Sequence, residues 1–176
     1  TVLFDILVAL TKLMAPVLSF TAEEIWRMLP ESVRVDSKAD SVHLAMFPEV
    51  DPRWNDLVLA ERWEQLLEVR TAVQAALEVQ RREKVIGAPL EAKVLIDAHS
   101  AQYNLLKTYG QDLPAFFIVS DVVLQSAPDL PEKPGFVITV EKATGVKCER
   151  CWNYRGSVGT SSDHPTLCDR CVEAVR

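Results

Sequence analysis

All four cysteines of this chain lie near its C-terminal end, in two C-x-x-C pairs. The first pair is Cys148 and Cys151, the second is Cys168 and Cys171, and 16 residues separate the pairs. A C-x-x-C turn directs two thiolates at one centre, so two such turns supply the four soft ligands of a tetrahedral zinc site. This spacing constrains the C-terminal fold more than any other feature of the sequence.

Two other uses of four cysteines have to be weighed against zinc. Four cysteines allow three disulfide pairings, and a C-x-x-C pair can serve as a thioredoxin-like redox motif. A redox motif is normally single and opens a helix in a βαβ unit, whereas disulfide frameworks are typical of short secreted chains. One structural zinc ion is therefore the preferred hypothesis. His164 lies between the pairs, but four thiolates already complete the ligand shell, so we expect this histidine at the surface.

Composition and charge narrow the class of protein. The 176 residues are 48% hydrophobic and 25% charged, which is typical of a globular chain with its own core. There is no apolar run of membrane-spanning length and no signal peptide, so we expect a reducing cytoplasm. The net charge of −6 argues against nucleic-acid binding by overall charge. The chain opens at Thr1 in a helical pattern without a cap, so we expect it to belong to a longer protein.

The first third of the chain has helical periodicity. One amphipathic helix is predicted from the apolar residues at positions 3, 6, 7, 10, 13 and 14, and Pro16 interrupts it. Thr21 and Glu24 fit an S/T-x-x-E capping box, which predicts the start of a second helix that Pro30 ends.

A long helix is predicted from Pro52 to about Ile86, with room for a break near Asn55 and Asp56 and with Gly87 as its C-terminal stop. Its apolar stripe consists of Trp63, Leu66, Leu67, Val73 and Leu77. Arg70 falls inside this stripe at 100° per residue. We favour a structural arginine that snorkels or pairs with a carboxylate, and a contact with a partner is the alternative.

The second half of the chain changes to short β-branched runs. "EAKVLID", "FFIVSDVVLQ" and "GFVITVE" predict strands, and "AQYNLLKTY" predicts a helix that ends at Gly110. The expected fold is α+β in several parts. A partial α-helical bundle covers residues 1–60, a long helix with a small mixed α/β unit covers residues 61–141, and a C-terminal four-cysteine zinc finger or knuckle covers residues 142–176.

Four motifs, in order, resemble one enzyme family. "LMAPVLSFTAEEIWRML" resembles the signature of the anticodon-binding helical domain in class I aminoacyl-tRNA synthetases for isoleucine, valine, leucine and methionine. "SVHLAMFPE" resembles the segment that follows it, although Trp is commoner at the position of Phe47. "LLEVRTAVQAALEVQRREKVIGAPLEAKV" resembles the next helix and turn of isoleucyl-tRNA synthetases. "CERCWNY" with "LCDRCV" resembles the zinc finger that bacterial isoleucyl enzymes share with some DNA glycosylases.

The resemblance implies the C-terminal, tRNA-recognising part of a bacterial-type isoleucyl-tRNA synthetase. The parent enzyme joins isoleucine to its tRNA with ATP, and ATP and Mg²⁺ would act in a catalytic domain. This chain has no H-I-G-H-like or K-M-S-K-S-like motif, so we expect it to be inactive by itself. The expected partners are the anticodon stem-loop of isoleucine tRNA and the remainder of the synthetase, in a monomeric enzyme without membrane contact.

Two other functions compete with this interpretation. A zinc-finger module of a DNA repair glycosylase would need a catalytic N-terminal residue and a two-helix DNA-binding unit, and neither is visible in the sequence. A purely structural zinc module without any nucleic-acid contact is the second alternative.

Trp152, with Arg150 and Arg155 beside it, is the candidate tRNA contact in the zinc module, and Arg70 is a further candidate. Loop bases are recognised largely by stacking on aromatic rings and arginine planes. Six basic and five acidic residues lie between Glu141 and Arg176, and a zinc ion with four thiolates adds −2, so the module cannot bind RNA by bulk charge. The alternative is that Trp152 packs over the zinc site as a core residue.

Overall fold

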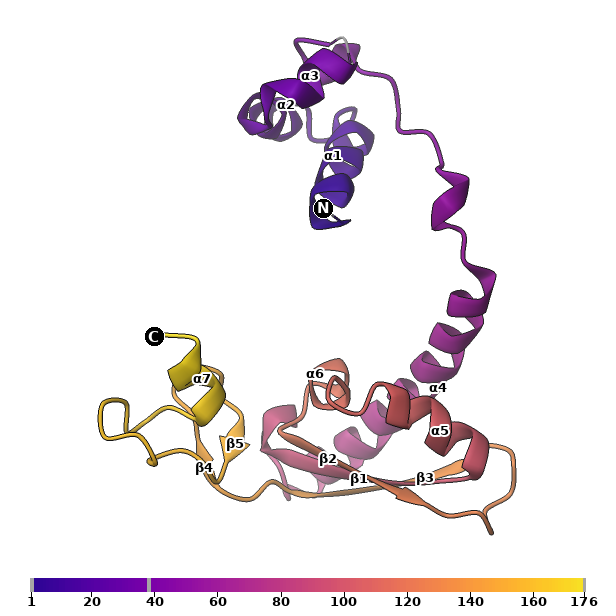
Figure 1. Ribbon diagram of the computed structural model, residues 1–176, viewed down its shortest axis with the longest axis vertical. Coiled ribbons are helices and arrows are strands. Elements are labelled where there is room, and N and C mark those ends of the chain that lie inside the picture. Colours follow the sequence, from indigo (N-terminus) through magenta and orange to yellow (C-terminus); the bar gives the residue numbers. More distant parts are fainter. Residues whose placement is uncertain (1, 38, 176) are drawn as a thin grey trace. The chain divides into compact units, whose positions relative to one another are not determined.

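The computed structural model describes residues 2–37 and 39–175, and the chain divides into two compact units, Thr1–Asp56 and Leu57–Arg176 (Figure 1). The three-part division at residues 60/61 and 141/142 stays a prediction. Helices, two small sheets and a four-cysteine cluster confirm the predicted α+β class. Within the described ranges, no helix has the length and apolar character that crossing a membrane requires.

The first unit is helical and is built around one tryptophan. It contains α1 (Val2–Met14), α2 (Ser19–Met28), α3 (Glu31–Ser37) and the 3-10 turns η1 (Val42–Leu44) and η2 (Pro52–Trp54). Trp26 is fully buried, and its indole Nε1 donates to the carbonyl oxygen of Ala39 at 3.1 Å. The indole N–H therefore has the partner that a buried tryptophan requires.

α2 begins two residues before the predicted capping box, so that prediction is wrong. Its helical hydrogen bonds already start at Leu18, whose carbonyl oxygen accepts the N–H of Ala22 at 2.8 Å. Thr21 therefore lies inside the helix, and no side chain caps its N-terminus.

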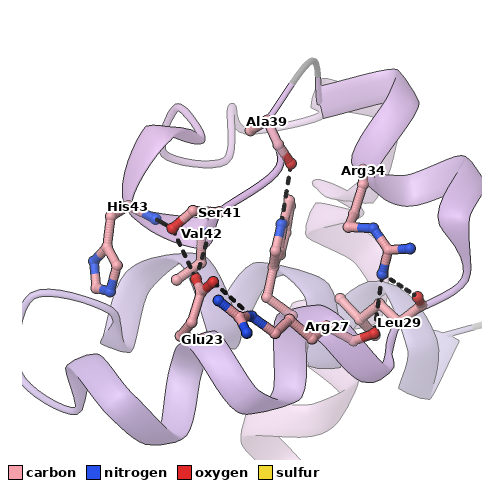
Figure 2. Close-up of polar contacts among 9 residues, drawn as sticks. Glu23, Arg27, Leu29, Arg34, Ala39, Ser41, Val42 and His43 are labelled. Atoms are coloured by element: carbon pink, nitrogen blue, oxygen red, sulfur yellow. Dashed lines mark hydrogen bonds and ion pairs between the residues drawn. The ribbon is translucent and has the colours of Figure 1, made fainter.

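Glu23, in the second turn of α2, ties the start of η1 to this helix, as Figure 2 shows. Its Oε2 accepts hydrogen bonds from the Ser41 hydroxyl at 2.8 Å and from the Val42 N–H at 3.0 Å. Its Oε1 accepts from Arg27 Nε at 3.0 Å. The hydrogen bond from Ser41, with those from Arg27 and Val42, holds the pKa of Glu23 below its ordinary value despite partial burial.

The apolar face predicted for the first helix is present, but it is exposed. Leu3 is 82% exposed and Leu13 is 52% exposed, and Thr11 is the buried residue of α1. The apolar residues predicted to form one face of α1 therefore lie outside the core of the first unit.

The second unit contains one long helix and a three-stranded sheet. Its elements up to the cysteines are α4 (Leu57–Arg82), η3 (Pro89–Glu91), β1 (Ala92–Ala98), α5 (Ser100–Thr108), α6 (Leu113–Phe117), β2 (Asp121–Ser126) and β3 (Phe136–Lys142). The sheet order is β2-β1-β3, with β1 parallel to β2 and antiparallel to β3. Alternate residues of β1 are fully buried in one core that includes Leu66 and Val73 of α4 and Leu106 of α5. The helices therefore cover one face of the sheet (Figure 1).

The predicted break near Asn55 and Asp56 is present, since η2 ends at Trp54 and α4 begins at Leu57. Two other boundaries differ from the sequence predictions. Phe116 and Phe117 were expected in a strand, but they end helix α6, and the strand begins at Asp121. Phe117 is buried in the core, and Phe116 packs edge-on against Trp63 with 5.5 Å between the centres of the two rings. These tertiary contacts override the β-propensity of residues 116–125. α4 ends at Arg82 and not near Ile86, because Lys84 adopts the left-handed conformation (φ +61°) that stops the helix before Gly87.

Candidate metal centre and its exposed face

The four cysteines converge from two turns. Cys148 and Cys151 follow the short strand β4 (Val146–Lys147), which pairs antiparallel with β5 (Tyr154–Arg155), and Cys168 and Cys171 lie at the start of α7 (Asp169–Glu173). We call residues 146–175 the knuckle, and residues 143–145, which join it to β3, the connection. Residue 176, counted in the charge balance above, lies outside the described residues.

The geometry of the four sulfurs fits a tetrahedral metal ion. All four Sγ atoms lie within 4.8 Å of one another, and all four cysteines are free. The Sγ atoms of Cys151 and Cys168 are 3.7 Å apart. A tetrahedron with metal–sulfur bonds of about 2.3 Å places its sulfurs about 3.8 Å apart. Three of the cysteines are fully buried and Cys151 is half-buried, so the centre is shielded from water.

Hydrogen bonds and burial act on the thiols in opposite directions. Burial alone would raise the pKa of Cys148, but hydrogen bonds from the backbone at Cys151, Cys168 and Arg150 lower it to about 6. Burial beside the other thiols raises the pKa of Cys168 to about 12. A set of four thiolates at this site therefore requires a cation at its centre.

Polar groups around the centre support the sulfurs. The N–H of Cys168 donates to Cys148 Sγ at 3.3 Å, and the Asn153 side chain donates to Cys151 Sγ at 3.7 Å. Arg150 Nη1 lies 3.7 Å from Cys171 Sγ, so this candidate tRNA contact also interacts with a ligand thiol. His164 is half-exposed and is not among the four converging residues.

Trp152 lies directly after the first cysteine pair, and its side chain is exposed. The backbone N–H of Trp152 donates to the carbonyl oxygen of Cys148 at 2.8 Å, and the backbone of Trp152 has φ +64°. The side chain is 60% exposed, and Lys147 Nζ lies 5.6 Å from the centre of the ring. The apolar cluster around the sulfurs instead contains Val158 and Leu167. Trp152 therefore does not serve as the core of the knuckle.

The two remaining candidate arginines lie in different elements. Arg155 is half-buried in β5, and its Nε is buried without a hydrogen-bond partner among the described residues. Arg70 lies in α4, with its guanidinium 5.2 Å from the ring of Phe116. This packing agrees with the structural role that we favoured, although the stacking partner is an aromatic ring and not a carboxylate.

Two features of the site gave no clear signal in the sequence. Lys147 meets the Trp152 ring only because the β4–β5 hairpin brings the two residues together. Ser120 contacts the knuckle across 34 residues: its hydroxyl accepts the N–H of Tyr154 at 2.7 Å. A lone serine before a strand carries no pattern that predicts this contact.

Two family models match the chain. The model described as the anticodon-binding domain of tRNA ligase matches residues 1–96, which is more than half of the chain. The model described as the zinc finger found in FPG and IleRS matches residues 145–174, which include all four cysteines.

Curated isoleucine–tRNA ligases are similar over the whole chain. The protein of Syntrophotalea carbinolica is 47% identical over 99% of this chain and 19% of its own length. The protein of Geobacter sulfurreducens is 45% identical over 100% of this chain and 19% of its own length. The protein of Moorella thermoacetica is 41% identical over 100% of this chain and 20% of its own length. The chain thus spans about a fifth of the length of these relatives, and the resemblance to isoleucyl-tRNA synthetases is confirmed.

Proposed function

Because this chain belongs to the anticodon-binding domain family of tRNA ligases, we propose that it recognises tRNA within an isoleucine–tRNA ligase. The observation that carries this proposal is the pairing of the two matches, to an anticodon-binding domain at residues 1–96 and to the FPG and IleRS zinc finger at residues 145–174. The identity of 47% to an isoleucine–tRNA ligase supports isoleucine over the other amino acids.

In this proposal the chain supplies binding energy and position, and the chemistry takes place elsewhere. The ligase attaches isoleucine to tRNA with ATP, and ATP and Mg²⁺ act in a catalytic domain outside this chain. Binding elements without a reacting site lower no chemical barrier, so the chain alone neither activates isoleucine nor charges tRNA. We place the ligase in the cytoplasm, as a monomer.

The metal in this proposal is one zinc ion held by Cys148, Cys151, Cys168 and Cys171. The sulfur spacing and the match to a zinc-finger family support zinc over other divalent ions. Elemental analysis of protein purified without chelator is expected to find one zinc per chain. Protein without metal, or a thiol titration that finds two disulfides, would overturn this assignment.

The anticodon stem-loop is the part of the tRNA that we assign to the knuckle. The exposed Trp152 ring offers a face on which an unstacked base can lie, and the Lys147 ammonium lies 5.6 Å from the centre of that ring. Arg150 and Arg155 are further proposed tRNA contacts in the knuckle, although Arg150 also interacts with Cys171 Sγ and the Nε of Arg155 is buried. A contact of Arg70 with tRNA is the secondary proposal, and it has less support because that guanidinium already stacks on Phe116.

Competition binding tests the proposed function. A ligase that carries this chain should bind isoleucine tRNA more tightly than other tRNAs and more tightly than duplex DNA. Duplex DNA tests the glycosylase-type alternative, because the same zinc-finger family includes FPG. Equal affinity for all tRNAs, or a preference for duplex DNA, would reject the proposal. Trp152→Ala tests the proposed stacking contact and should weaken binding of isoleucine tRNA by about 1–3 kcal/mol. Val146→Ala, which removes another exposed apolar side chain from the same hairpin, is the matched control and should leave tRNA binding unchanged.

A further inference from the structure

Ser120 connects the knuckle to the sheet through a single hydroxyl. It is 2% exposed and directly precedes β2. Its Oγ accepts the N–H of Tyr154 in β5 at 2.7 Å and donates to the carbonyl oxygen of Leu90, before β1, at 2.5 Å. Its own N–H donates to the carbonyl oxygen of Ala92 at 3.1 Å. One residue thus contacts the start of β1, the start of β2 and the knuckle hairpin.

The chemistry of the three groups leaves one arrangement of the hydrogen bonds. A backbone carbonyl can only accept and a backbone N–H can only donate, so the hydroxyl must donate to Leu90 and accept from Tyr154. Both capacities of the hydroxyl are used in a buried position, where a lost partner is costly. Other side chains with a hydroxyl at the same place could make the same pair of bonds, and apolar side chains could not.

The junction between the knuckle and the sheet around Ser120 is lined mainly by polar residues. A cavity of about 220 Å³ lies there, lined by Ser120 and Asp121 of the sheet, Thr144 of the connection, and residues 154–157 of the knuckle. The connection itself is fixed by the N–H of Ala143, which donates to the carbonyl oxygen of Glu91 at 2.6 Å. Beyond this connection, the Ser120 bond is the direct polar tie between the hairpin and the strand among the described residues.

We propose that the Ser120 hydroxyl is a positioning group that fixes the orientation of the knuckle on the sheet. Tyr154 follows Trp152 by two residues, and it pairs with Lys147, whose ammonium lies against the Trp152 ring. An orientation fixed at Tyr154 is therefore passed to the ring within one hairpin. The consequence for tRNA rests on the proposed function, whereas the consequence for the hairpin does not.

The test uses Ser120→Thr and Ser120→Val in a whole ligase that carries this chain. Threonine and valine have nearly the same shape, so they differ at this site in the hydroxyl alone. In the valine variant, amide exchange in the peptide that contains Tyr154 should be about three- to tenfold faster, because one hydrogen bond is lost. The threonine variant should exchange like the parent. Ser126→Ala, at the exposed end of the same strand, is the control.

Enzyme assays separate positioning from a general loss of stability. In the valine variant, zinc content and isoleucine-dependent exchange of pyrophosphate into ATP should be unchanged, and the KM for tRNA should rise about three- to tenfold. Threonine should restore the KM. If Ser120→Thr and Ser120→Val both lower the rate of pyrophosphate exchange to the same extent, Ser120→Ala is used in place of Ser120→Val. Amide exchange in the peptide that contains Tyr154 is then the deciding measurement.

Parental amide exchange at Tyr154 in the variant without the hydroxyl would overturn the inference. Faster amide exchange with an unchanged KM, in a ligase where Trp152→Ala also leaves tRNA affinity unchanged, would instead reject the proposed tRNA contact and keep the positioning role. Faster amide exchange with an unchanged KM, where Trp152→Ala does weaken tRNA binding, would overturn the link between Ser120 and the ring.

Discussion

The backbone of Trp152 allows its ring and its conformation to be tested separately. At φ +64° the residue is in the left-handed region, which costs a residue with a side chain about 1–2 kcal/mol. Glycine adopts this region freely and loses about 0.5–1 kcal/mol in additional chain entropy. Trp152→Gly and Trp152→Ala both remove the ring and its contact with Lys147. We therefore expect the knuckle of the glycine variant to be more stable than that of the alanine variant by roughly 0.5–1 kcal/mol.

Zinc affinity reports this difference, because folding of a small metal module is coupled to metal binding. A chelator competition with each ligase variant should give about two- to fivefold tighter zinc binding for glycine than for alanine. Affinity for isoleucine tRNA should fall equally in both variants, by about 1–3 kcal/mol, because both lack the stacking surface. Stability and tRNA affinity thus change independently of each other at one position.

The two outcomes that would refute this reasoning are distinct. Zinc binding by the glycine variant that is no tighter than binding by the alanine variant would mean that the turn does not store strain at Trp152. Different tRNA affinities for the two variants would mean that the backbone, and not the ring, makes the contact. Trp152→Phe is the control: it keeps a flat face and the same backbone cost, so it should retain part of the tRNA affinity.

Three further predictions concern a carboxylate, a glycine and the metal ion that stabilise the two units locally. Glu23→Gln should lower the unfolding free energy of the first unit by about 1–2 kcal/mol, because a neutral amide accepts weaker hydrogen bonds at Ser41. Because folding lowers the pKa of Glu23, its carboxylate contributes this stability fully at pH values above its pKa in the unfolded chain. The contribution is lost as the pH falls through the pKa of Glu23 in the folded protein, so the thermal unfolding of parent and variant should converge in acid. Gly145→Ala should weaken zinc binding, because φ is +97° and a Cβ would collide with the Arg155 carbonyl; Gly156→Ala, which meets nothing within 4 Å, should not. Removal of zinc should speed amide exchange after residue 143 and leave the three-stranded sheet protected, as hydrogen-exchange mass spectrometry would show.

Features with a local physical cause were predictable from the sequence. The convergence of the four cysteines follows from their spacing, since two C-x-x-C turns present four thiols that can meet at one centre. The helix at residues 100–108 and the strands at residues 92–98 and 136–142 follow from periodicity and from the glycines and prolines that bound them. Pro16 and Pro30 end helices because they cannot donate a backbone hydrogen bond.

Features that depend on distant contacts were not predictable. The run at residues 116–125 has the composition of one strand, but Phe116 is drawn into a helix by its packing on Trp63 and Arg70 of α4. Glu23 has the appearance of a helix-start charge, and its carboxylate instead binds a loop 18 residues away. Periodicity identified the apolar stripe of α1, but it gives no information on whether a partner covers that face.

In the tRNA contact that we propose for the knuckle, its near-neutral charge makes orientation the main source of affinity. A strongly basic module attracts RNA in many orientations, since counterion release depends on the number of phosphates neutralised and not on the direction of one ring. Stacking requires a ring face held parallel to a base, so any freedom of the hairpin lowers the affinity that the ring can contribute. Three structural features reduce that freedom. The four cysteines fix the turn before Trp152, the left-handed backbone directs its side chain outward, and Ser120 fixes the following strand to the sheet. Losing any one of them should therefore weaken tRNA binding even though the ring itself is still present.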